Sequence, residues 1–113
     1  MLFVHCWNYF LLYLNFYQNI CYMYNIKNYT YKRAKHLGLR VRPSTDKTKK
    51  IDVYKQNKKI ASVGAYGMND YPTYIQKRGI KYAKTRRRLY KQRHERDRHV
   101  KWSRGWLADQ LLW

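Results

Sequence analysis

The stretch "TRRRLYKQRHERDRH", residues 85–99, holds the side chains of this protein that are best suited to chemistry. Seven of its fifteen residues are Arg or Lys, two are His and two are acidic. Such a mixture is compatible with three kinds of site: a metal site built on the histidines, a catalytic site built on the acids, and an anion site built on the basic residues. The spacing of the side chains discriminates among the three.

The histidines do not have the spacing of a zinc-binding helix. In the H-E-x-x-H motif of zinc proteases, two histidines one turn apart share a helix face. His94 and His99 are five residues apart, which separates them by about 140° on a helix that turns about 100° per residue. The surrounding arginines would also repel a cation. We therefore expect no metal site in this stretch.

The acidic residues are too scattered for a catalytic site. A nuclease needs clustered carboxylates to hold a metal ion, and among the six acids of the chain only Glu95 and Asp97 are near neighbours. Residues two apart do not meet on a helix; we expect instead i,i+4 ion pairs of Lys91 with Glu95 and of Arg93 with Asp97. The sequence also has no glycine-rich phosphate loop, serine elbow or C-x-x-C motif. We expect no enzyme, no catalytic residue and no cofactor.

The basic residues have the clearest chemical meaning. The chain has 25 Lys and Arg against 6 Asp and Glu, a net charge of +19, and residues 77–104 alone hold 13 basic and 2 acidic residues. This surplus favours an anionic partner, nucleic acid before a membrane surface. Cations spread around a helix suit phosphate contacts better than the reading of bases. The predicted nucleic-acid-binding residues are Lys84, Arg86, Arg87, Arg88, Lys91, Arg93, Arg96, Arg98 and Lys101.

The predicted partner is nucleic acid, DNA before RNA, bound through non-specific phosphate contacts. Two alternatives stay open: a solvated basic face without a dedicated partner, and a structural protein that binds acidic proteins. Tyr74, Tyr82 and Tyr90 could stack on exposed bases, although tyrosines at helical spacing more often pack in a core.

The first 22 residues are a separate, aromatic-rich segment. Residues 1–26 contain no Lys, Arg, Asp or Glu, and four Asn and Gln residues interrupt the apolar run. Its strictly apolar part is short against the roughly 20 residues of a membrane-spanning helix. A membrane anchor, a buried aromatic helix and an upstream extension before a natural start at Met23 all fit; we favour the extension. A membrane partner is expected only if this segment is genuine. Its cysteines, Cys6 and Cys21, have no disulfide or zinc pattern.

Residues 23–113 are expected to form one small α+β domain, in which two or three helices pack on a β-hairpin and a long basic helix lies near the C-terminus. The hairpin is the clearest local signal, because apolar residues alternate on both sides of a polar break at Gln56 and Asn57. Within it, Ile51 and Val53 are predicted to share one face.

The helices are predicted from caps and apolar spacing. We expect helical segments at residues 30–37, 71–78, 80–97 and 106–113, and an extended piece at residues 39–44. Thr30 is the expected N-cap of the first helix and Gly38 its expected C-cap. Asn69 or Asp70 is the expected cap of the second. Residues expected to cover the hairpin are Trp106, Leu107, Leu111 and Trp113.

The long helix, residues 80–97, must position most of the predicted cations. Tyr82, Ala83, Leu89 and Tyr90 fall on one stripe of this helix. We expect Leu89 and Tyr90 to hold it against the core of the hairpin.

The order of four motifs resembles a known family. The chain contains, in this order, "KKIDVYKQNKKIASVGAYG", "DYPTYI", "RRRLYKQRHERDR" and "GWLADQLLW". Together they resemble a family of small basic proteins, a domain of unknown function, from nucleocytoplasmic large DNA viruses, the giant viruses of protists and algae. The resemblance covers residues 27–113 and involves Asp52, Val53, Tyr54, Lys59, Ile60, Ala61, Ser62, Gly64, Asp70, Tyr71, Arg87, Arg88, Tyr90, Arg93, His94, Gly105, Leu112 and Trp113.

This resemblance implies a viral origin, and with it a place in the virion or in the infected host cell. It brings no catalytic residues. The family pattern begins near "MYNIKNYTYKRAK", which supports a start at Met23. Related chains continue past "LLW" with a basic tail, so this chain is expected to be either a short member or a truncated reading frame. For a viral protein of this charge, we expect a role in packaging or organising the genome, or a place beside it in the virion. The alternative is a structural protein that binds acidic virion proteins.

Overall fold

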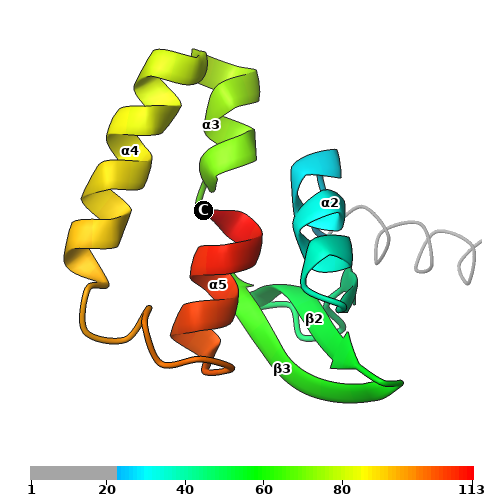
Figure 1. Ribbon diagram of the computed structural model, residues 1–113. Coiled ribbons are helices and arrows are strands. Elements are labelled where there is room, and N and C mark those ends of the chain that lie inside the picture. The colour runs from blue at the N-terminus through cyan, green and yellow to red at the C-terminus, as the bar shows by residue number, and fades with distance from the viewer. Residues whose placement is uncertain (1–22) are drawn as a thin grey trace, which may run out of the picture.

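The computed structural model describes residues 23–113, and the predictions made for residues 1–22 lie outside this range. The described elements are α2 (Asn28–His36), β1 (Arg40–Pro43), β2 (Lys49–Lys55), β3 (Lys58–Ala65), α3 (Tyr71–Arg78), α4 (Ile80–Arg93) and α5 (Arg104–Leu112). They form an α+β fold, as predicted. The sheet lies at one end of the molecule, and the helices pack on it and on one another (Figure 1).

The sheet has three antiparallel strands in the order β1-β2-β3. The predicted hairpin is confirmed: β2 and β3 are joined at Gln56 and Asn57, whose φ angles are 51° and 64°. Two residues with positive φ make the turn whose twist matches that of the flanking strands. The extended piece before the hairpin is β1, which pairs with β2 and places Val41 opposite Val53.

The core lies between the sheet and α5. Ile51 and Val53 of β2 are 0% exposed, as are Leu107 and Leu111 of α5. Trp106 and Trp113 are partly buried against the same cluster. The prediction that this C-terminal helix covers the hairpin is therefore confirmed, and its driving force is the burial of apolar side chains from both elements.

The first described helix, α2, begins earlier than predicted. Its N-cap is Lys27, so Thr30 lies inside the helix and its prediction as N-cap is wrong. Thr30 is fully buried, and its hydroxyl donates to the backbone oxygen of Leu111 at 2.8 Å. Thr30 therefore fastens α2 to α5 rather than capping the helix. The C-cap is Leu37, one residue before the predicted Gly38. Gly38 follows it with φ of 72°, a conformation that favours glycine and ends the helix.

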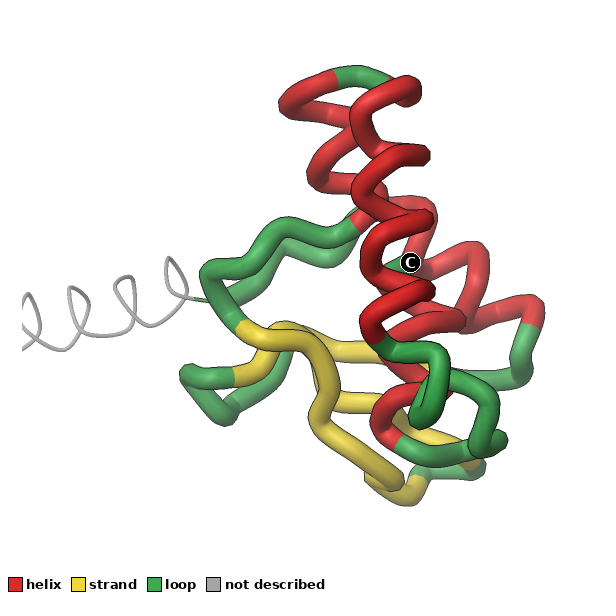
Figure 2. Tube along the Cα trace, turned by 90° about the vertical axis from the view of Figure 1, so that its left-hand side faces the viewer, coloured by secondary structure: helices red, strands yellow, loops and turns green. Residues whose placement is uncertain are grey.

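The two central helices, α3 and α4, form a hairpin that rises beside α5 (Figure 2). Asp70 caps α3 by accepting a hydrogen bond from the Thr73 N–H at 3.0 Å, which confirms one of the two predicted caps. No helix within residues 23–113 has the length and apolar character that crossing a membrane requires.

The basic helix α4 is shorter than predicted. It ends at Arg93 rather than at Asp97. No apolar residue occurs between Tyr90 and Val100, so a further turn would have no apolar side chain to bury. Because helices in proteins are stabilised mainly by packing an apolar face, the chain leaves the helix there and forms turns.

The prediction that Leu89 and Tyr90 hold α4 against the core of the hairpin is also wrong. Leu89 is 40% exposed. Tyr90 is buried, but its ring stacks on Trp113 at the end of α5, with centroids 4.3 Å apart and planes at 7°. The reason is that α5 covers the hairpin, so α4 packs on α3 and on the end of α5 instead (Figure 1).

A buried ion pair joins the sheet to α3. Lys50 Nζ lies 2.9 Å from Asp70 Oδ2, and the two side chains are 4% and 1% exposed. The Tyr24 hydroxyl donates to the same carboxylate. Burial alone would raise the pKa of Asp70, but the Lys50 ammonium and the hydrogen bonds to the carboxylate lower it below its usual value. Asp70 therefore links the segment before α2, strand β2 and the start of α3.

Replacing Asp70 by Asn should destabilise the fold strongly, because Lys50 would keep a buried charge without a counter-ion. Removal of one partner of a buried pair costs about 3–5 kcal/mol, and urea denaturation near neutral pH should show a loss of this order. The matched control is Asp97→Asn, whose carboxylate is 59% exposed. There the loss should stay below about 1 kcal/mol.

The wild type and the Asp70→Asn variant also test the charge state of Asp70. Its pKa is lower in the folded than in the unfolded chain. Its stabilising contribution is therefore present above the unfolded-state pKa, about 4, and is lost as pH falls through the folded-state pKa. The difference in stability between the wild type and Asp70→Asn should shrink as pH falls below about 4. If the difference in stability between the two proteins does not change with pH, the ionised Lys50–Asp70 pair is not the source of that difference.

Candidate nucleic-acid interface

The nine predicted cations do not form one surface. Residues seven apart lie nearly above one another on a helix, so Arg86 and Arg93 share one side of α4. They line a cleft between α4, α5 and the sheet. The opposite side borders a shallow groove of about 450 Å³, lined by Lys84, Arg87, Arg88, Lys91, Gln92, Glu95 and Arg98. We call these two surfaces the cleft and the outer groove.

A stripe of cations runs along the outer groove. Lys81, Lys84, Arg88 and Lys91 follow one another at steps of three or four residues, the spacing of one helix face. At 1.5 Å per residue the stripe is about 15 Å long. Lys81 is exposed and was missed among the predicted residues, although this spacing would have found it.

Two predicted cations are held by an acid on α5. Lys91 Nζ lies 3.0 Å from Asp109 Oδ1, and Arg98 lies 3.8 Å from its second oxygen. The Asp109 side chain is 2% exposed. Lys91 and Arg98 therefore fasten α4 and the following turn to α5, and part of their charge is neutralised. Neither predicted ion pair, Lys91 with Glu95 or Arg93 with Asp97, is formed.

The acids and histidines after α4 pair locally. Glu95 lies 2.8 Å from Arg98 and 2.7 Å from His99, and hydrogen bonds from these two side chains lower the pKa of Glu95. Asp97 lies 3.5 Å from His94. The two histidines thus have different acidic partners. Among residues 23–113, no three His, Cys, Asp or Glu side chains lie where they could hold a metal ion together.

The last predicted cations, Arg96 and Lys101, lie in the connection between α4 and α5. Arg96 is exposed in a turn. The Lys101 ammonium lies 5.5 Å from the ring centroid of Trp102, which Lys55 of the hairpin also approaches, at 3.9 Å. Trp102 has φ of 70°, a conformation that bulky residues rarely adopt. Both cations thus lie outside the surfaces lined by α4.

Two arginines of α4 are oriented by tyrosines of α3. The Arg87 guanidinium lies 4.5 Å from the ring centroid of Tyr71, and that of Arg86 lies 5.4 Å from Tyr74. Cation–π contacts of this kind restrict the guanidinium groups without neutralising them. These tyrosines therefore support cations, which was not among their predicted roles.

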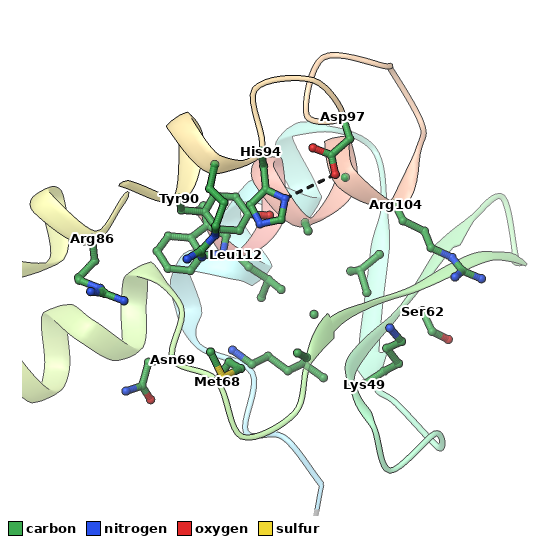
Figure 3. A pocket seen from close by; sticks show the side chains of 18 of the residues that line it. Lys49, Ser62, Met68, Asn69, Arg86, Tyr90, His94, Asp97, Arg104 and Leu112 are labelled. Atoms are coloured by element: carbon green, nitrogen blue, oxygen red, sulfur yellow. Dashed lines mark hydrogen bonds and ion pairs between the residues drawn. The ribbon is translucent and has the colours of Figure 1, made fainter. Parts of the chain in front are cut away.

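The cleft has a volume of about 380 Å³ and is lined by residues far apart in sequence (Figure 3). Lys49 at the start of β2 and Arg104 at the start of α5 lie on its rim. Gly64 of β3 lines it too; a Cβ there would come within 2.7 Å of Leu112, so only glycine lets β3 approach α5 this closely. No local pattern brings Lys49 and Arg104 together, and both were missed for that reason.

The cleft also has an aromatic lining, formed by Tyr74, Tyr90 and Trp113. Tyr74 and Trp113 are partly exposed, whereas Tyr90 is buried beneath Trp113. Burial raises the pKa of Tyr90 to about 12, so its hydroxyl stays neutral. Of the three tyrosines considered for base stacking, Tyr74 has accessible surface in the cleft, and Tyr90 serves as support.

Comparison of the chain with protein-family models, with curated proteins and with solved structures finds no match in any of the three. The resemblance to small giant-virus proteins therefore stays a prediction.

The role of Asp109 can be tested with two neutral substitutions on α4. Lys91→Gln should lower the free energy of unfolding by about 1–3 kcal/mol, because it leaves a buried carboxylate without its main partner. Arg88→Gln removes the same charge from an exposed side chain of the same helix and should change stability by less than about 0.5 kcal/mol. Equal effects in urea denaturation would rule out the anchoring role of Lys91.

Proposed function

We propose that this protein is a non-enzymatic nucleic-acid-binding protein that contacts phosphates through the outer groove of α4. The observation that carries this proposal is the unpaired part of the stripe, Lys81, Lys84 and Arg88. These side chains are exposed and form no ion pair with any acid of the described chain. The oriented Arg87 lies beside them.

The form of the outer groove favours backbone contacts over base reading. It is shallow and open and offers long, flexible side chains. Phosphate contacts need positive charge but little fixed geometry, whereas base reading needs a narrow strip of hydrogen-bonding groups that fits the major groove. The proposed binding is accordingly indifferent to sequence and dominated by the release of counterions.

The biological setting rests on the sequence resemblance. A small, strongly basic protein of a giant DNA virus would meet the viral genome during packaging or inside the particle. This setting is why DNA stands before RNA as the proposed partner, and the virion or the infected cell is the proposed location. Detection of peptides from this chain in purified particles by mass spectrometry would support it; their absence from particles would favour a role in the infected cell.

A salt titration tests the proposed binding. The stripe, Arg87 and Arg98 offer cations for about four to six phosphates, of which Lys91 and Arg98 are partly neutralised. The logarithm of the binding constant for duplex DNA should therefore fall against log salt with a slope of about −4 to −5. The double variant Lys84→Gln with Arg88→Gln should reduce this slope by about 2, since each lost phosphate contact contributes about 0.9. Fluorescence anisotropy with a labelled duplex provides the measurement.

The matched control is Lys32→Gln with Lys35→Gln. It removes the same charge from exposed positions of α2, which lies on the far side of α5 from α4 (Figure 1). This control should keep the wild-type slope. If both double variants reduce the slope equally, binding is spread over the whole basic surface and the outer groove is not the site. Lack of any binding at low salt would refute the proposed function itself.

A further inference from the structure

The cleft has a rim of cations that form no close ion pairs. Lys49, Arg86, Arg93 and Arg104 line it, and none of them forms an ion pair with an acid of the part of the chain described. The acid on the rim, Asp97, is paired with His94. Lys50 also lines the cleft, but Asp70 neutralises it. The cleft thus presents a concentrated positive charge to whatever enters it.

Arg104 has no role in stabilising the helix on which it lies. It is the first residue of α5, where the helix dipole disfavours a cation. The N-cap of this helix is Ser103, whose hydroxyl accepts a hydrogen bond from the Trp106 N–H at 3.1 Å. A cation at an unfavourable position without a compensating partner is typical of a functional site.

The aromatic groups inside the rim are fixed in place. Trp113 is held by Tyr90, which stacks on it at 4.3 Å, and by Tyr74, whose ring centroid lies 6.2 Å away. Both Trp113 and Tyr74 keep exposed surface in the cleft. Aromatic side chains with accessible surface bind nucleic-acid bases by stacking, whichever base is offered.

The size of the cleft limits its occupant to a small group. About 380 Å³ lies near the lower end of the range of roughly 300–1,000 Å³ that holds small ligands. A nucleotide with an unpaired base provides both features that the cleft offers to a ligand, a flat aromatic ring and a phosphate. A glutamate-rich peptide would match the cations but leave the aromatic surface unused. A paired base is stacked within its duplex and is not available to the cleft.

We propose that the cleft binds a nucleotide whose base is unpaired, with the base against Tyr74 and Trp113 and the phosphate between Arg93 and Arg104. The nucleotide is either free or an unpaired position of a single strand. This proposal rests on the proposed function in one respect, that the ligand belongs to the nucleic acids. Its site lies on the opposite side of α4 from the outer groove, so the two proposals can fail separately.

Two cleft variants test this proposal on the full chain. Arg93→Gln with Arg104→Gln removes two exposed cations, and Met68→Glu places a negative charge in the cleft at a side chain that is 65% exposed. Neither change touches the core. The ligands are an oligothymidylate, a duplex of equal length, thymidine 5′-monophosphate and poly-L-glutamate. Dissociation constants are measured at one fixed ionic strength, and an unchanged urea midpoint confirms the fold of each variant.

Both cleft variants should weaken oligothymidylate binding about tenfold and duplex binding by less than about threefold. Thr45→Glu adds the same charge at an exposed loop position outside the cleft and should leave both constants nearly unchanged. Lys84→Gln with Arg88→Gln should instead weaken duplex binding more than the cleft variants do. If Lys84→Gln with Arg88→Gln does not weaken duplex binding, while the cleft variants act as expected, the outer groove is not the duplex site and the cleft proposal stands.

The other two ligands identify the source of the nucleotide. If thymidine 5′-monophosphate binds and the cleft variants weaken this binding, the cleft is a site for free nucleotides. If the variants weaken only oligothymidylate binding, the cleft is a site for a strand. Either result supports the proposal. It is overturned if the cleft variants weaken duplex binding as much as oligothymidylate binding, since the rim is then a phosphate surface without a base site. It is also overturned if poly-L-glutamate binding falls equally, since the cleft then accepts acidic peptides.

Discussion

The fold depends on the buried charge pair of Lys50 and Asp70. Asp70 caps α3, pairs with β2 and accepts a hydrogen bond from Tyr24, so one carboxylate fixes the position of three segments. Because this chain has few acids and many cations, each buried acid attracts several basic side chains and strongly influences how the elements pack. The direction in which α3 leaves the sheet follows from this pair, and with it the place of α4.

A second buried acid, Asp109, sorts the remaining charge. It holds Lys91 and Arg98 against α5 and thereby fixes the rotation of α4 about its own axis. One side of α4 then faces solvent with Lys81, Lys84 and Arg88, and the other faces the cleft with Arg86 and Arg93. The two acids thus divide the cations of α4 between two distinct basic surfaces, the outer groove and the cleft.

Features determined by near neighbours were predictable from the sequence. The hairpin turn at Gln56 and Asn57, the Asp70 cap and the overall α+β class needed no more than local propensity. The anchoring of the cations of α4 was not predictable, because it depends on Asp109, which is 18 residues from Lys91. The cleft was missed for the same reason, because the elements that surround it, β2, β3, α4 and α5, include segments far apart in sequence that the fold brings together.

The most direct test of two separate basic surfaces is lysine-reactivity footprinting, in which acetylation of each lysine is compared by mass spectrometry with and without bound nucleic acid. With a duplex, protection should appear at Lys81 and Lys84. With a single strand it should extend to Lys49 on the cleft rim, while Lys32 and Lys35 on α2 stay reactive in both cases. Uniform protection of all lysines, or protection that begins on α2, would contradict the account.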